Sequence, residues 1–251
     1  MIFSIKPGVF KAGVFKSVLL AVTAAMLAGG ASAADSDSWS FLPAAERPDP
    51  GTPNLTGKWA MATPIRVLKT VDGKEPPLLP AAKAKYAANQ AALKTNPKSD
   101  PNSNCWIQGV PRIIYASYPM LIAQDKDRVN LIYETNHTFR IVSLRHPLPK
   151  WDDDLDPHWL GYSAGHWDGK TLVIDTIGQH DQTWLDYSGL PHSEKLKVQE
   201  RYTLDGADRI NGELTIEDPE TFAKPWSTRF TLVRQPGYDL KENVCVRDHK
   251  M

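Results

Sequence analysis

The sequence predicts an all-β domain, a sandwich or a barrel of mainly antiparallel strands. Three observations support this class: short β-rich runs recur through the second half of the chain, turn residues separate them, and 20 prolines and 8 tryptophans accompany a single helical pattern. The hydrophobic content of 41% and the charged content of 23% are ordinary for a folded protein, so most of the chain is expected to be ordered.

Each expected strand is bounded by turn signals. Asn136-His137 forms one turn, and Asp168-Gly169 is a hairpin signal. A further turn at 205–208 separates two runs of alternating apolar and polar residues. The expected strands are a first one beginning at 57–59 (Gly-Lys-Trp), followed by 128–134, 138–143, 170–176, 196–204, 209–216 and 230–233.

One helix and one long loop complete the expected domain. Residues 77–95 are rich in alanine, Pro80 suits a first helical turn, and Asn96-Pro97 ends the pattern. The insert 144–166 is too long for a hairpin and carries tryptophans, so we expect an ordered loop. Because no internal repeat is present, residues 57–251 are expected to form one β-barrel domain after an extended, proline-rich lead-in at 34–56.

The first 33 residues have the features of a secretory signal peptide. Lys6, Lys11 and Lys16 precede an apolar run at 18–27, and Ala31-Ser32-Ala33 fits a cleavage signal. The apolar run is too short to span a bilayer of about 30 Å. We therefore expect cleavage near Ala33 and a periplasmic or secreted product without stable membrane insertion; a membrane anchor is the alternative.

Removal of the signal peptide changes the charge balance. The whole chain has 29 basic and 29 acidic residues. Cleavage removes three lysines and no acidic residue, so the mature chain has a formal net charge of −3. A general nucleic-acid binder needs a basic excess to neutralise phosphates, so nucleic acid is not an expected partner.

The chain has two cysteines, Cys105 and Cys245. In an oxidising compartment such a pair favours one long-range disulfide. Two separate buried thiols are the alternative interpretation.

Six of the seven histidines fall between positions 137 and 192, and this cluster is the main candidate site. His192 lies in a loop, Glu200 follows on the next expected strand, and Asp181 precedes it. A carboxylate beside an imidazole orients the ring and adjusts its pKa for acid–base catalysis. We predict His192 as the general acid or base, with Glu200 or Asp181 as its partner.

Arg140 lies between apolar neighbours on the expected strand 138–143. If its side chain faces the interior, Arg140 is a candidate to bind an anion or a carbonyl; an exposed cross-strand pair is the alternative. His137, at the end of the preceding turn, is expected to help polarise an oxygen of the substrate. The remaining expected substrate-binding residues are Trp159, Tyr162, Trp184, Arg145 and His146.

Standard metal and cofactor signatures are absent from the sequence. It contains no H-E-x-x-H, C-x-x-C, P-loop or G-x-G-x-x-G pattern, and the acidic run 152–156 fails the EF-hand spacing. Residues 161–165 fit G-x-S-x-G but lead into a hairpin instead of a helix. No organic cofactor is expected. A metal held by His180, Asp186 and His192 is kept as an alternative.

Five separated motifs occur in order between residues 105 and 226. They are C-x-x-x-G-x-P-R at 105–112, H-W-D-G-K-T-L-V-I-D-T at 166–176, H-S-x-x-L-x-x-x-E-R at 192–201, E-D-P at 217–219 and K-P-W at 224–226. Together they resemble a large, mostly uncharacterised family of exported bacterial proteins, over about 105–246. The resemblance implies a lipocalin-like β-barrel and no particular reaction.

The functional hypothesis is a periplasmic lyase, hydratase or isomerase without an organic cofactor. It would act on a small apolar or aromatic molecule by acid–base catalysis with a histidine and a carboxylate. Two alternatives stay open, because fold does not decide between them. One is a non-catalytic periplasmic binder of a hydrophobic ligand, and the other is a metal-dependent hydrolase.

Overall fold

The computed structural model describes residues 42–152 and 155–245. The expected signal peptide, the first part of the lead-in and two residues of the acidic run 152–156 lie outside the described residues.

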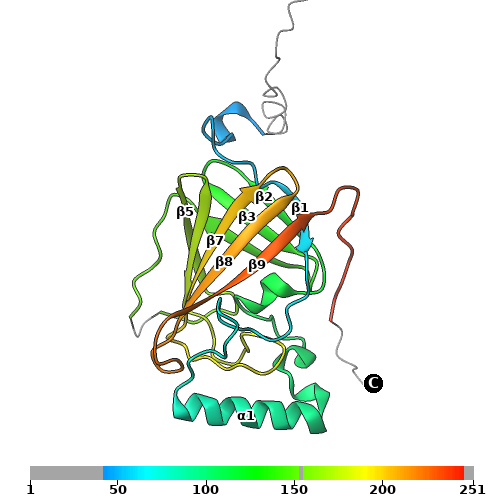
Figure 1. Cartoon of the computed structure of the whole chain (residues 1–251). Helices are drawn as coiled ribbons and strands as arrows, with labels where there is room; N and C mark the ends of the chain where they lie inside the picture. The colour runs from blue at the N-terminus through cyan, green and yellow to red at the C-terminus, as the bar shows by residue number, and fades with distance from the viewer. Residues whose placement is uncertain (1–41, 153–154, 246–251) are drawn as a thin grey trace, which may run out of the picture. The chain divides into compact units, whose positions relative to one another are not determined.

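Within the described residues, nine strands form a closed barrel in chain order (Figure 1). Strand β1 closes it by pairing with β9, with Trp59 opposite Arg234. The prediction of an all-β barrel with one α-helix is therefore confirmed. The strands are β1 (Gly57–Met61), β2 (Met120–Gln124), β3 (Arg128–Tyr133), β4 (Thr138–Ser143), β5 (Tyr162–Asp168), β6 (Thr171–Ile177), β7 (Lys197–Asp205), β8 (Arg209–Glu217) and β9 (Trp226–Arg234).

Neighbouring strands are antiparallel except at one junction. β4 and β5 are parallel and share the bridge between Ser143 and Ala164. Two parallel neighbours start at the same end of the barrel, so the chain has to return to that end between them. The insert between β4 and β5 provides this return. The insert was expected to extend to residue 166, but it ends before Tyr162, where β5 begins.

The long connections gather at one end of the barrel, where β1, β3, β6 and β8 end (Figure 1). We call the segments 62–119, 178–196 and 218–225 the loop layer. Helix α1 (Pro80–Thr95) belongs to it and starts at Pro80, which needs no hydrogen-bond partner for a backbone N–H at the first helical position. The short helices are η1 (Ala44–Glu46), η2 (Pro97–Ser99), η3 (Pro101–Asn104) and η4 (Arg112–Tyr115).

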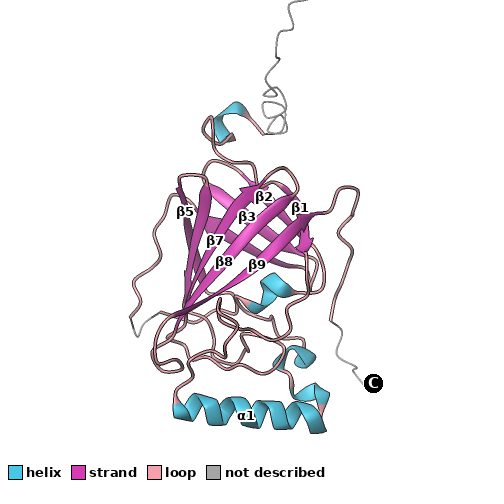
Figure 2. Cartoon of the chain, viewed as in Figure 1, coloured by secondary structure: helices cyan, strands magenta, loops and turns pink. Residues whose placement is uncertain are grey.

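Helix η4 is buried along its whole length. Figure 2 shows it directly beneath the strands, whereas α1 lies farther out. The loop layer therefore closes this end of the barrel with buried chain.

Alternation along the strands turns mostly apolar side chains toward the barrel interior. Gly212 on β8 is required for this packing, since a Cβ there would lie 2.1 Å from the Phe230 ring. The Phe230 ring crosses β8 at this position and meets the Tyr202 ring edge-on at 5.6 Å.

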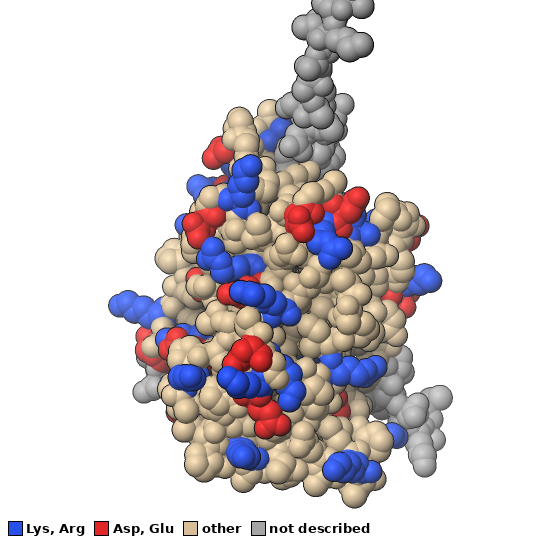
Figure 3. All heavy atoms as spheres, viewed as in Figure 1, with Lys and Arg blue, Asp and Glu red and all other residues tan. Residues whose placement is uncertain are grey.

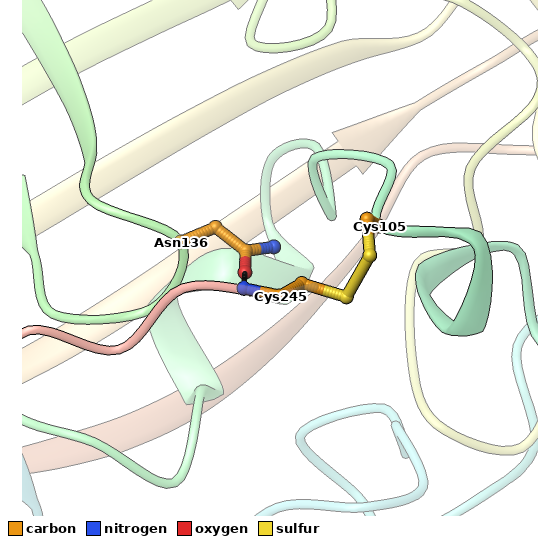
Figure 4. Close-up of a disulfide and its surroundings, with 3 residues drawn as sticks. All are labelled: Cys105, Asn136 and Cys245. Carbon is orange, nitrogen blue, oxygen red and sulfur yellow. Dashed lines mark hydrogen bonds between the residues drawn. A yellow bond between two sulfur atoms is a disulfide. The ribbon is translucent and has the colours of Figure 1, made fainter. Parts of the chain in front are cut away.

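Cys105 and Cys245 form a disulfide with Cα atoms 5.4 Å apart, as the sequence predicted (Figure 4). The bridge ties residues 238–245, here called the C-terminal strap, to the loop layer. The Cys245 N–H donates to Asn136 Oδ1 at 3.1 Å, and Glu134 accepts from the Tyr238 hydroxyl at 2.7 Å. The strap thus covers the β3–β4 turn.

Basic and acidic side chains are interspersed on the face shown in Figure 3. Exposed ion pairs such as Arg229–Glu213 contribute to this mixture. Among the described residues, no helix combines the length and apolar composition needed to cross a membrane.

Candidate functional site

Arg140 lies on the inner face of the barrel. Thr138, Arg140 and Val142 of β4 are buried, whereas the alternate residues Phe139 and Ile141 are 65% and 53% exposed. The Arg140 side chain pairs with Glu200 of β7, with 2.7 Å between Nη2 and Oε1. In the sheet, β5 and β6 lie between β4 and β7, so the pair crosses the barrel interior.

Three tyrosines surround this ion pair. Tyr202 is two residues beyond Glu200 on the same face of β7, and its hydroxyl donates to Glu200 Oε2 at 2.6 Å. Tyr133 ends β3 and interacts electrostatically with Arg140 and Glu200. Tyr115 lies in η4, and the charges of Asp186 and Glu200 act on its buried hydroxyl. We call these five buried residues the interior cluster.

Burial sets the protonation states in the interior cluster. It raises the pKa of each of the three tyrosines, so their hydroxyls keep their protons at neutral pH. Burial is the largest single effect on Arg140 and would lower its pKa, but the charge and hydrogen bond of Glu200 together with Tyr133 and Tyr202 outweigh it, so the net shift is upward. Arg140 therefore stays a cation.

Four buried polar atoms of the interior cluster have no hydrogen-bond partner among the residues that the structure describes. They are Nε and Nη1 of Arg140 and the hydroxyl oxygens of Tyr115 and Tyr133. Buried polar groups in native proteins are almost always paired with protein, water or ligand. These atoms are therefore available to a polar group that enters the barrel.

Apolar side chains border the interior cluster. Leu131 lies opposite Arg140 across the β3–β4 ladder, and Ile174 and Leu214 flank Glu200 on β6 and β8. The Phe230 ring packs against Tyr202. A molecule held there would meet polar groups on one side and hydrocarbon on the others.

A surface hollow of about 460 Å³ lies on the outer side of β3 and β4, beside the C-terminal strap. Its lining includes Tyr133, His137 and residues 240–242 of the C-terminal strap. Tyr133 contributes to this lining, although the residue is only 2% exposed and its hydroxyl is buried.

His192, the predicted acid or base, is buried in the loop layer with both ring nitrogens engaged. Nδ1 lies 2.9 Å from the Ser193 carbonyl oxygen, and Nε2 lies 2.8 Å from Thr183 Oγ1. Because a carbonyl can only accept, we assign the proton to Nδ1, so that Nε2 accepts from the Thr183 hydroxyl. Burial lowers the pKa of His192 against the opposing effects of the Ser193 carbonyl and of the nearby Asp218 and Asp181.

The structure does not join His192 to either predicted carboxylate by a hydrogen bond. Both oxygens of Glu200 are bound within the interior cluster, to Arg140 and Tyr202. Asp181 is exposed. His137 is also exposed, in the β3–β4 turn with a positive φ of 48°, so its side chain is not part of the buried cluster.

The other expected substrate-binding residues lie outside the interior cluster. The Trp159 ring packs at a tilt against Trp106 and His180, with ring centroids 5.4 Å and 5.0 Å away. Trp184 is buried in the loop layer. The Tyr162 hydroxyl donates to the Asp156 carbonyl oxygen at 3.0 Å.

Arg145 and His146 follow the end of β4 and are exposed. Arg145 pairs there with Asp127 of the β2–β3 turn, at 3.3 Å. They therefore lie at the end of the barrel opposite the loop layer.

The alternative metal ligands have separate partners. Asp186 is fully buried and accepts hydrogen bonds from the backbone N–H groups of Leu68, Ser188 and Leu190. His180 stacks on Trp159, and His192 is bound to Thr183 and Ser193. In the part of the chain that the structure describes, no three His, Cys, Asp or Glu residues are placed to hold a metal ion.

Sequence reasoning found Arg140 and Glu200 but missed the three tyrosines. Tyr202 shares the alternation of Val198 and Glu200, and Tyr133 that of Val129 and Leu131. Side chains of a strand alternate between its two faces, so this alternation could have predicted that both tyrosines face the interior. Tyr115 lies in a short helix and gave no such signal.

Comparisons of the chain with protein-family models, curated proteins and solved structures give no match. The fold and the site define a closed β-barrel with a polar cluster in its interior. The functional conclusion therefore depends on this geometry.

Proposed function

We propose that the protein binds a small molecule inside the barrel, with the apolar part of the ligand against the wall and a polar group at the interior cluster. The observation that carries this proposal is the set of four unpartnered polar atoms on Arg140, Tyr115 and Tyr133. Among the functions considered from the sequence, it is closest to the binder of a hydrophobic ligand.

The energetics of the Arg140–Glu200 pair support a functional role. Removing two charges from water costs several kcal/mol for each ion, and well-packed hydrophobic residues in their place are often as stabilising or more so. Here both side chains are almost fully buried, and two nitrogens of Arg140 also lack partners. Stability alone therefore does not explain the buried ion pair, and this favours a role of the pair in binding.

An exported location is part of the proposal. The Cys105–Cys245 bridge is a feature of oxidising compartments, and the resemblance to exported bacterial proteins agrees with it. We infer that the mature protein acts in the periplasm or outside the cell.

A lyase, hydratase or isomerase reaction stays a prediction, and its two predicted acid–base residues are occupied by other partners. Both nitrogens of His192 are engaged, and both oxygens of Glu200 are engaged. The metal-dependent hydrolase likewise stays a prediction. Ligand binding requires neither a base nor a metal, so it is the simpler explanation of the interior cluster.

The test is displacement of the uncharged fluorophore 1-aminoanthracene from the mature protein by a panel of small apolar compounds. Wild type is compared with the double variant Arg140→Met/Glu200→Gln, which removes both charges together. The matched control is Arg229→Met/Glu213→Gln, which removes an ion pair of similar length, 2.9 Å, from the outer surface.

Binding that is lost in the interior variant and kept in the surface variant supports the proposal. Equal binding by wild type and the folded interior variant contradicts it. Circular dichroism of each variant checks that the barrel is intact.

A further inference from the structure

We propose that the interior cluster selects an uncharged carbonyl oxygen, as in a ketone, aldehyde, ester or amide, over a carboxylate. This inference rests on the proposed function and names the chemical class of its ligand.

The unpartnered atoms are mainly hydrogen-bond donors. Nε and Nη1 of Arg140 can only donate, and the hydroxyls of Tyr115 and Tyr133 carry protons that no protein acceptor takes. Both oxygens of Glu200 are already bound to Arg140 and Tyr202. The complementary group is therefore an oxygen that accepts, and an ammonium or other donor-only group finds no free carboxylate.

Two of these donors can reach the same oxygen. Tyr133 lies opposite Thr138 in the β3–β4 ladder, and Arg140 is two residues beyond Thr138. Diagonal neighbours of this kind on one face of a sheet are about 7–8 Å apart at the backbone, within reach of long side chains. One carbonyl oxygen has two lone pairs and could accept from the Tyr133 hydroxyl and the Arg140 guanidinium together.

The charge balance of the interior argues against an anion. Arg140 and Glu200 neutralise each other, so a bound carboxylate would add an uncompensated negative charge. A second fully buried carboxylate, Asp186, acts on Tyr115 from the loop layer and adds to the negative potential there. Because an unpaired buried charge is far more costly than a hydrogen-bonded neutral group, the site favours the neutral acceptor.

Three probes on one aromatic ring separate these possibilities: acetophenone, benzoate and ethylbenzene. They offer a neutral carbonyl, a carboxylate and no acceptor, and the Tyr202 and Phe230 rings provide an aromatic wall for all three. Dissociation constants are measured by ligand-observed NMR titration at pH 7.5. We expect acetophenone to bind about tenfold more tightly than either benzoate or ethylbenzene.

The variant Tyr133→Phe tests the donor directly, since its hydroxyl has no protein partner to lose. It should weaken acetophenone binding about fivefold and leave ethylbenzene binding unchanged. The control Tyr86→Phe removes a hydroxyl that bonds Ser188 beside α1, at 2.6 Å, and should change neither constant.

The outcomes distinguish the inference from the proposed function. If benzoate binds as tightly as acetophenone, or if Tyr133→Phe leaves acetophenone unaffected, the carbonyl preference is wrong although interior binding survives. If none of the three probes binds, ethylbenzene included, interior binding fails and the carbonyl preference fails with it.

Discussion

At the scale of single residues, the interior cluster depends on contacts that local sequence cannot specify. The period of two on β4 and β7 indicates that Arg140 and Glu200 share an inner face with Val142 and Val198. It cannot indicate that β4 and β7, separated by two strands in the sheet, bring these side chains within 2.7 Å. The same limit explains why the sequence paired Glu200 with His192, its neighbour in the chain, instead of Arg140.

The Arg140–Glu200 pair gives the first residue-scale prediction. Arg140→Met leaves a buried, unpaired carboxylate and should lower the free energy of unfolding by about 3–5 kcal/mol. The double variant Arg140→Met/Glu200→Leu should recover most of the loss, because no uncompensated charge remains. Urea denaturation at pH 7.5 measures both, and a double variant no more stable than the single one would show that the charges do not act as a pair.

His192 gives a pH-dependent prediction. Burial lowers its pKa below the ordinary value of 6.5, so the unfolded chain binds this proton more readily than the folded one. The stability that neutral His192 contributes is present above pH 6.5 and is lost as the pH falls below that value.

In wild type we expect the free energy of unfolding to decrease from pH 6.5 to pH 5, by at most about 1.4 kcal/mol per pH unit for this one group. His192→Gln removes the titrating ring and should flatten that slope. Denaturation across this pH range checks it, with the exposed His146→Gln as control. An unchanged slope in His192→Gln would assign the dependence to other groups.

At the scale of elements, strands with clear alternation and flanking turns could be predicted closely. The expected 128–134, 138–143 and 209–216 correspond to β3, β4 and β8. β2 was missed because its apolar run shows little alternation in sequence, although its burial alternates. β5 was missed because Ser163, Ala164 and Gly165 are poor indicators of a strand, and pairing with β6 overrides that preference.

Hydrogen bonds to Glu134 and Asn136 hold the C-terminal strap to the β3–β4 turn, and the disulfide joins it covalently to the loop layer. Cys105→Ser/Cys245→Ser opens a loop whose ends are 140 residues apart. The chain-entropy relation gives about 4–5 kcal/mol for a loop of this length. We expect a loss of stability of up to that size, measured by urea denaturation.

Reductant provides the matching control for the strap. Dithiothreitol should lower the stability of wild type and leave that of the double serine variant unchanged. If the two proteins were equally stable without reductant, the strap would be held by Glu134 and Asn136 instead of the bridge.

At the scale of the whole molecule, the site is assembled from parts that only the closed barrel brings together. Tyr133, Arg140 and Glu200 come from β3, β4 and β7, and Tyr115 comes from η4 in the loop layer. The spacing of strands and turns predicted a sandwich or a barrel, and the family resemblance implied the barrel. They could not identify the site, because closure and the burial of η4 decide which side chains meet.

A ligand that binds this assembly should therefore stabilise the whole barrel at once. Binding to the folded state alone raises the free energy of unfolding by about 2.7 kcal/mol at a ligand concentration one hundred times the dissociation constant. Acetophenone at that excess should raise the melting temperature of wild type in one cooperative transition. The folded variant Arg140→Met/Glu200→Gln should show a clearly smaller rise at the same concentration, since its cluster has lost the guanidinium donors. A rise of equal size in both proteins would mean that acetophenone binds elsewhere, and the interior cluster would then be a structural feature alone.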